Sequence, residues 1–203
     1  MQSINIMTDA AMIRCKKCMH KYNVRCNFCD MVVYYVKIRI TEVCVMYRIA
    51  MEKLLKWKQS KRRKPLIIEG ARQVGKTWLM KEFGKQAYAD TVYINFDSNS
   101  RMAELFASDL DTKRLIMGIE LYVGRKINSE NCLLIFDEVQ EVPRALSSLK
   151  YFYENAPQYH IICAGSLLGI ALHQGTSFPV GKVDFLKLYP LSFKEFLMAT
   201  DKE

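Results

Sequence analysis

The sequence has no long hydrophobic run. A membrane-spanning helix needs about 18 or more mostly apolar residues in succession. The nearest candidate is the short run at residues 31–36, which Lys37 and Arg39 follow. The N-terminus also lacks the basic stretch, apolar stretch and small-residue cleavage site of a secretory signal peptide. We therefore expect a cytoplasmic protein with no membrane partner.

Most of the chain also lacks the excess of positive charge that its net charge of +9 suggests. Residues 1–64 hold 15 Lys or Arg against 4 Asp or Glu, whereas residues 65–203 hold 15 against 17. The excess ends in a basic run at residues 61–64, which we interpret as a solvated linker. The body of the chain therefore gives no support for nucleic-acid binding.

From Met46 onward, apolar stretches of strand character alternate with helical patterns, and no internal repeat is present. The expected strands cover residues 66–70, 91–96, 132–136, 160–164 and 183–188. The expected helices cover residues 46–60, 76–86, 109–123, 143–155 and 192–199, with Ser192 and Glu195 as a capping box in the last. This alternation predicts an α/β fold of three layers around a parallel sheet.

A glycine-rich loop lies between the first expected strand and the helix after it. It consists of Gly70, Ala71, Arg72, Gln73, Val74, Gly75, Lys76 and Thr77, which fit the pattern G-x-x-x-x-G-K-[ST]. Glycines let successive backbone N–H groups face one anion, and the positive end of the helix adds to that field. We expect the loop to bind the phosphates of ATP. Lys76 would reach the β- and γ-phosphates, and the hydroxyl of Thr77 would bind Mg²⁺.

A second motif follows the apolar strand at residues 132–136. Asp137 comes directly after this strand, at the edge where ligands bind in open α/β sheets, and we expect it to hold Mg²⁺, mostly through water. Glu138 could polarise the attacking water. A GTPase would have Asp-x-x-Gly at residues 137–140, and the guanine-reading motif Asn-Lys-x-Asp is absent from the chain. The aspartate Asp137 followed by Glu138 therefore favours a site that hydrolyses ATP.

Four segments narrow the class of ATPase further than the two motifs alone. They lie at residues 70–77, 136–140, 164–166 and 189–196. In them the sequence resembles a prokaryotic family of AAA+-superfamily P-loop ATPases, whose members typically carry a C-terminal domain of unknown function. The resemblance covers about residues 46–203 and implies that Ser166 senses the γ-phosphate. It also implies an arginine near position 182 that serves a neighbouring subunit. Lys182 stands there instead and lacks the planar guanidinium, which puts that role in doubt.

The resemblance further implies a helical lid and a C-terminal domain after the ATPase part. No residues follow Glu203 to form them, so we expect a truncated ATPase core without its lid. The last expected helix carries Phe193, Phe196 and Leu197, an apolar face that such a domain would cover. We therefore expect marginal solubility and weak ATPase activity.

Residues 1–45 are rich in cysteine and have no counterpart in that family. Cys15, Cys18, Cys26 and Cys29 form two C-x-x-C pairs, and four thiolates could hold Zn²⁺ with His20 as a spare ligand. The seven residues between the pairs are fewer than in common zinc modules. Two alternatives remain: Met46 is the true initiator and the first 45 residues are upstream sequence, or these residues form a natural unstructured tail.

The sequence thus favours a Mg²⁺-dependent ATPase whose turnover changes conformation or partner binding. One alternative is a nucleotide-binding interaction module that hydrolyses ATP poorly. Another is a zinc- and DNA-binding protein that uses the basic N-terminal segment. The expected partners are ATP, further copies of this chain and a protein that the sequence does not identify.

Overall fold

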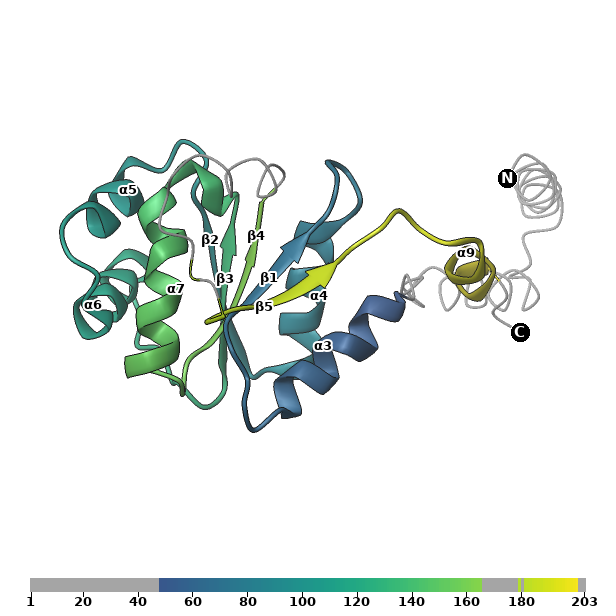
Figure 1. Cartoon of the computed structure of the whole chain (residues 1–203), viewed down its shortest axis with the longest axis horizontal. Coiled ribbons are helices and arrows are strands. Elements are labelled where there is room, and N and C mark those ends of the chain that lie inside the picture. The colour runs from purple at the N-terminus through teal and green to yellow at the C-terminus, as the bar shows by residue number, and fades with distance from the viewer. Residues whose placement is uncertain (1–47, 166–178, 180, 201–203) are drawn as a thin grey trace, which may run out of the picture. The chain divides into compact units, whose positions relative to one another are not determined.

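The computed structural model describes residues 48–165, 179 and 181–200 of the chain (Figure 1). Contacts divide the chain into the units Met1–Met46 and Tyr47–Glu203, and the described residues all belong to the second. Within these ranges no helix has both the length and the apolar character that a membrane crossing requires.

The centre of the second unit is a parallel sheet of five strands, in the order β2-β3-β4-β1-β5 (Figure 1). The strands are β1 (Leu66–Glu69), β2 (Asp90–Asn95), β3 (Cys132–Asp137), β4 (His160–Ala164) and β5 (Asp184–Lys187). Consecutive strands of a parallel sheet require crossover connections, and helices connect the first four strands. The expected α/β fold with a parallel sheet is confirmed.

Helices cover both faces of this sheet. The helices are α3 (Ile49–Gln59), α4 (Lys76–Ala87), α5 (Ser100–Ala107), α6 (Thr112–Val123), α7 (Pro143–Asn155) and α9 (Phe193–Thr200), with a 3₁₀ turn η1 (Val139–Glu141) after β3. One core cluster joins α3 and α4 to one face, and the other joins α5, α6 and α7 to the opposite face. The expected three layers are therefore present.

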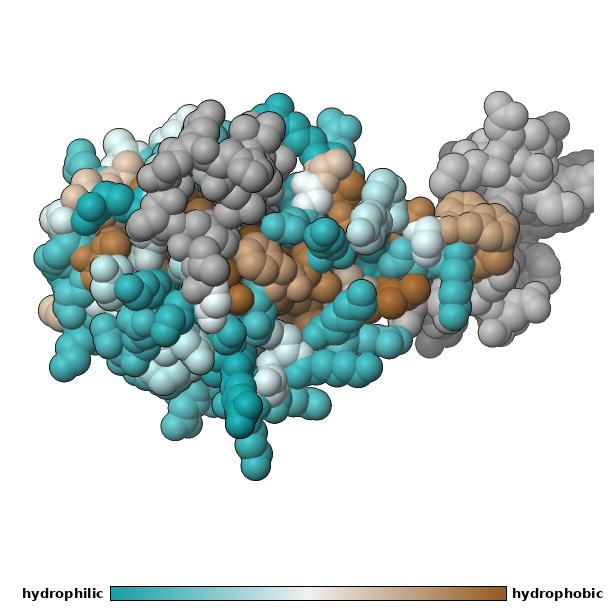
Figure 2. Space-filling view, in the orientation of Figure 1, coloured by the Kyte–Doolittle hydropathy of each residue, from teal (hydrophilic) through white to brown (hydrophobic). Residues whose placement is uncertain are grey.

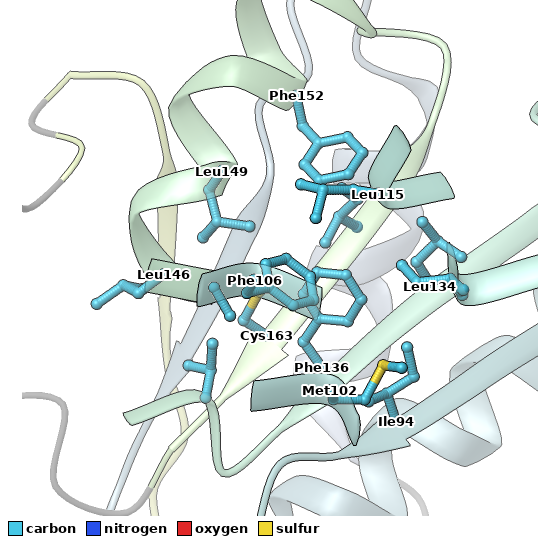
Figure 3. Close-up of a cluster of buried hydrophobic side chains, with 14 of the residues drawn as sticks. Ile94, Met102, Phe106, Leu115, Leu134, Phe136, Leu146, Leu149, Phe152 and Cys163 are labelled. Atoms are coloured by element: carbon cyan, nitrogen blue, oxygen red, sulfur yellow. The ribbon is translucent and has the colours of Figure 1, made fainter. Parts of the chain in front are cut away.

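The core beneath α5, α6 and α7 is built on aromatic rings (Figure 3). Phe96, Phe106 and Phe136 meet pairwise edge to face, with ring centroids 5.5–6.0 Å apart. Leu134 and Phe136 of β3 belong to this core, whereas Leu133 and Ile135 belong to the other. Because both faces of β3 are covered, every residue of the strand is buried, which explains its lack of polar alternation.

The core beneath α3 and α4 contains a group of rings near the amino ends of the strands. The Tyr88 hydroxyl lies 2.6 Å from Nδ1 of His160, and Trp57 contacts both His160 and Phe83. Burial lowers the pKa of His160 to about 4, and the positive charges of Arg63 and Lys58 add to this effect. The imidazole is therefore neutral near pH 7, and Nδ1 can accept a hydrogen bond from Tyr88.

Two helix starts differ from the sequence-based expectation. The segment 109–123 was expected to be helical throughout, but α6 begins at Thr112 because the Asp111 carboxylate caps it by accepting from the N–H of Arg114. The helix α5 was not expected at all. Its N-cap is Asn99, whose side chain accepts from the N–H of Met102.

The basic run at residues 61–64 is only partly solvated, so its interpretation as a linker needs correction. Arg63 donates to the carbonyl oxygen of Pro157 at 3.2 Å, and Lys64 donates to that of Gly181 at 2.8 Å. These two side chains hold the turn between α3 and β1 against the amino ends of the strands. Only Lys61 and Arg62, the first half of the run, are exposed to solvent.

Candidate functional site

The loop between β1 and α4 depends on two glycines. Gly75 has a φ of 90°, a left-handed conformation that strains residues with a Cβ atom. Gly70 has a different reason, because a Cβ atom there would lie 2.4 Å from the carbonyl oxygen of Leu188. Leu188 is fixed in turn, since its N–H donates to the carbonyl oxygen of Glu69 at 2.7 Å. The loop therefore curls tightly against the chain that leaves β5.

The ammonium of Lys76 lies inside the curl of this loop. It donates to the carbonyl oxygens of Gly70 at 2.9 Å and Ala71 at 2.8 Å, and the residue is only 7% exposed. Burial lowers the pKa of Lys76, while the carboxylates of Glu138 and Asp137 oppose that shift. A positive charge is thus held at the N-terminus of α4, where backbone N–H groups also favour an anion.

The loop meets the end of β3 through a direct hydrogen bond. The Thr77 hydroxyl donates to Oδ2 of Asp137 at 2.7 Å, although 60 residues separate the two in sequence. Oδ2 also accepts from the hydroxyl of Tyr93 at 2.9 Å, and Oδ1 accepts from the N–H of Glu138 at 3.1 Å. Asp137 is 3% exposed. Hydroxyl and carboxylate oxygens are the ligands that Mg²⁺ prefers, so Thr77 and Asp137 fit such an ion.

Glu138 follows with a left-handed backbone and a held side chain. Its φ is 50°, which is uncommon for a residue other than glycine. The Gln140 amide donates to Oε2 of Glu138 at 2.6 Å, while Oε1 of Gln140 is buried without a hydrogen-bond partner among the described residues. The negative charge of Glu138 opposes the burial that lowers the pKa of Lys76. A carboxylate placed here can orient a water molecule or accept its proton.

The structure brings together the expected residues of the loop, Asp137 and Glu138, but not Lys182. Lys182 precedes β5 and so lies at the amino edge of the sheet, whereas the loop follows β1 at the carboxyl edge. There it pairs with Glu154 at 3.0 Å. A role for Lys182 in a neighbouring copy stays a prediction.

Other expected site residues lie outside the described residues. These are Ser166, which follows β4, and the N-terminal Cys15, Cys18, Cys26, Cys29 and His20. In the ranges that the structure does describe, no group of three or more His, Cys, Asp or Glu side chains could hold a metal ion. The zinc hypothesis therefore stays a prediction.

Three side chains of the site were missed by the sequence analysis: Tyr93, Lys81 and Gln140. Tyr93 was interpreted only as a β-forming residue, and nothing in the sequence reveals that β2 lies beside β3 with Asn95 opposite Asp137. Lys81 lies one helical turn after Thr77, with its Nζ 3.7 Å from the centroid of the Tyr93 ring. Gln140 could have been found from its position two residues after Glu138.

Comparison with known proteins gives one informative match. A family model described as an AAA domain matches residues 62–197, which is two thirds of the chain and includes the loop, Tyr93 and the residues at the end of β3. No curated protein is significantly similar to the sequence.

Two solved structures are similar to the chain over about three quarters of its length. An AMPPCP-bound DnaA from Aquifex aeolicus matches with a TM-score of 0.47 and 19% identity, over 74% of this chain and 48% of that chain. PCH-2 from C. elegans matches with a TM-score of 0.39 and 17% identity, over 75% of this chain and 46% of that chain. The chain therefore spans about half the length of either protein.

Proposed function

Since the chain belongs to the family of AAA domains, we propose that it binds ATP with Mg²⁺ and hydrolyses it to ADP and phosphate. The observation that carries the proposal is the 2.7 Å hydrogen bond between Thr77 and Asp137. It joins the glycine loop to the acidic end of β3, so that anion-binding and metal-binding groups share one edge of the sheet.

Each group of the site has a task in this proposal. The backbone N–H groups of residues 70–77 and the ammonium of Lys76 bind the phosphates. Thr77 and Asp137 would hold Mg²⁺, which when bound neutralises charge on the β- and γ-phosphates. The geometry supports this division, because Lys76 and Thr77 are adjacent on the first turn of α4 yet contact different partners.

Hydrolysis requires a water molecule whose oxygen attacks the γ-phosphorus while the bond to the bridging oxygen breaks. We assign Glu138 to orient this water and to accept its proton. The hydrogen bond from Gln140 supports the assignment, since it restrains the carboxylate of Glu138 next to Asp137.

The proposal keeps two further residues from the sequence analysis, Ser166 and Lys182. Ser166 lies outside the described residues, and its role as a sensor of the γ-phosphate rests on the family resemblance alone. Lys182 lies at the opposite edge of the sheet from its own loop. It could therefore contribute only to the site of a neighbouring copy of the chain.

The test is nucleotide binding and turnover by the full chain and two variants. Lys76→Ala should weaken ATP binding by about tenfold to a hundredfold, because a buried charged donor to phosphate is lost. Glu138→Gln should keep the ATP affinity and lose turnover. Calorimetry or a fluorescent ATP analogue measures the first effect, and steady-state phosphate release measures the second.

Matched controls use exposed residues of the same type. Lys85→Ala removes a lysine from the last turn of α4, and Glu130→Gln changes an exposed glutamate before β3. Unchanged ATP affinity in folded Lys76→Ala would refute the binding site. Binding without turnover in the unmodified chain would favour the interaction module. DNA binding that falls with salt and survives deletion of residues 1–45 would favour a DNA-binding protein.

A further inference from the structure

The carboxylate of Asp137 is held by three donors that come from three different places in the fold. Thr77 on α4 and Tyr93 on β2 both donate to Oδ2, at 2.7 and 2.9 Å, and the N–H of Glu138 donates to Oδ1 at 3.1 Å. A carboxylate at a strand end can otherwise rotate about its side-chain bonds. Together these donors fix the plane of the group as well as its position.

Tyr93 reaches Asp137 because of its place in the sheet and its length. In the register of β2 and β3, Tyr93 lies opposite Ile135, two residues before the strand end, and Asn95 lies opposite Asp137. The hydroxyl must therefore span about 6.5 Å along the strand direction, the rise of two residues. Among the side chains favoured in strands, tyrosine supplies that reach and a donor at its end.

The ring of Tyr93 is itself held by α4, the helix that begins with the phosphate-binding lysine. Lys81 places its Nζ 3.7 Å from the ring centroid, within the range of a cation–π interaction. Thr77 and Lys81 are four residues apart on α4 and so share a face of the helix. One helix thus contacts Asp137 twice, directly through Thr77 and indirectly through Lys81 and Tyr93.

We propose that Tyr93 is a positioning residue that orients Asp137 to bind a divalent cation together with a nucleoside triphosphate. In this arrangement Lys81 holds the Tyr93 ring in place. The inference rests on the proposed function and deepens it, because it names a group on β2 that controls the metal half of the site. On this inference Tyr93 affects the binding of the metal, whereas the loop and Lys76 bind the phosphates.

The test measures binding of a fluorescent ATP analogue to the full chain, once across a Mg²⁺ titration and once with the metal chelated. Tyr93→Phe keeps the ring, its packing and its contact with Lys81, and removes only the hydroxyl. We expect the half-saturating Mg²⁺ concentration to rise about three- to tenfold, since one hydrogen bond to a charged group is lost. The affinity for the analogue without Mg²⁺ should stay unchanged.

The matched control is Tyr151→Phe, a half-exposed tyrosine on α7 at the opposite face of the sheet, which should leave both measurements unchanged. If the unmodified chain binds the analogue with Mg²⁺ and Tyr93→Phe has the same half-saturating Mg²⁺ concentration, the inference is wrong and the proposed function stands. If the unmodified chain binds no analogue, both are wrong.

A second variant keeps the inference testable if Tyr93→Phe does not fold. Lys81→Met retains most of the apolar stem and removes the charge over the ring. It should raise the half-saturating Mg²⁺ concentration about two- to threefold in the chain with Tyr93, as expected for a cation–π contact at an exposed site. An unchanged half-saturating Mg²⁺ concentration in folded Lys81→Met would contradict the part assigned to Lys81. Where Tyr93→Phe also folds, the double variant should show no effect beyond that of Tyr93→Phe alone. An equal effect in both backgrounds would show that Lys81 does not act through the tyrosine hydroxyl.

Discussion

Glu138 combines a strained backbone with a restrained side chain. Its φ of 50° costs about 1 kcal/mol or more for a residue with a Cβ atom. Gln140 donates to its carboxylate at 2.6 Å, and the following 3₁₀ turn begins with the fully buried Val139. Because the surrounding fold imposes this conformation, Glu138→Gln should leave the backbone unchanged. The substitution therefore tests the carboxylate alone.

His160 gives the fold a predictable dependence on pH. Its pKa is lowered to about 4, below the ordinary value of 6.5, chiefly by burial. As the pH falls below 6.5, the unfolded chain takes up a proton that the folded chain does not, so the free energy of unfolding decreases until the pH reaches about 4. This one group should lower stability by about 2 kcal/mol between about pH 7.5 and pH 5.

Urea denaturation at several pH values, followed by circular dichroism, would measure this effect. His160→Gln keeps an acceptor for the Tyr88 hydroxyl but does not titrate, so its stability should fall less over the same pH range. If the variant and the unmodified chain lose the same stability, the titration of His160 contributes nothing.

At the scale of elements, one carboxylate joins the ends of two helices. Glu195 completes the capping box of α9 by accepting from the N–H of Ser192 at 2.9 Å, and its other oxygen accepts from the N–H of Ile49 at 2.9 Å, at the start of α3. Arg48 pairs with this oxygen at 3.5 Å and donates to the carbonyl oxygen of Tyr189. Burial opposes the charge on Glu195, but these N–H donors and Arg48 hold its pKa below the ordinary value.

We predict that Glu195→Ala costs about 3 kcal/mol, because it removes caps from two helices and leaves Arg48 buried without its anionic partner. Chemical denaturation measures this loss. Glu104→Ala, at an exposed position on α5, should change stability by less than about 0.5 kcal/mol. A similar small effect for both substitutions would mean that the junction between α3 and α9 adds little.

The sequence predicted most elements because each carries a local signal. The fully apolar runs of β3 and β4 mark buried strands, and Ser192 with Glu195 marks the start of α9. It failed at α5, whose eight residues are too few for a clear helical period. Strand order was also beyond reach, since pairing between parallel strands leaves no local pattern.

In the candidate site, too, residues in local motifs could be predicted, whereas residues joined only by tertiary contacts could not. Residues 70–77, Asp137 and Glu138 were predicted because each motif is contiguous and lies at a strand end. The contacts of Tyr93 and Lys81 depend on the neighbouring position of β2 and β3 and on how α4 packs above them. Such contacts arise from tertiary structure, so a single sequence does not reveal them.

At the scale of the whole molecule, the face seen in Figure 2 is mostly hydrophilic, and exposed apolar side chains lie on α9 and in the segment before it. Tyr189 is 68% exposed and Phe193 is 75% exposed. Exposed aromatic residues of this kind accompany interaction surfaces or a tendency to aggregate. The expectation of marginal solubility stays a prediction, and it concerns this segment more than the sheet core.

We predict that a chain starting at Met46 retains the ATP affinity of the full chain within about twofold, a change of under 0.5 kcal/mol. Each residue assigned to the phosphates and the metal lies in the unit Tyr47–Glu203, and the family match starts at residue 62. Binding of the same fluorescent ATP analogue to both chains measures this. A loss of affinity beyond tenfold would give residues 1–45 a part in the site.

The position of β4 between β1 and β3 has a consequence for how the protein folds during its synthesis. The loop follows β1 and Asp137 ends β3, yet these two strands are joined only through β4, which comes later in the chain. During synthesis, the ribosome must therefore release the chain past Ala164 before the two halves of the site can be fixed in register. Until then no ligand can stabilise the nascent domain, because stabilisation requires a site that exists only in the folded form. The proposed binding of nucleotide would then follow the insertion of the middle strand.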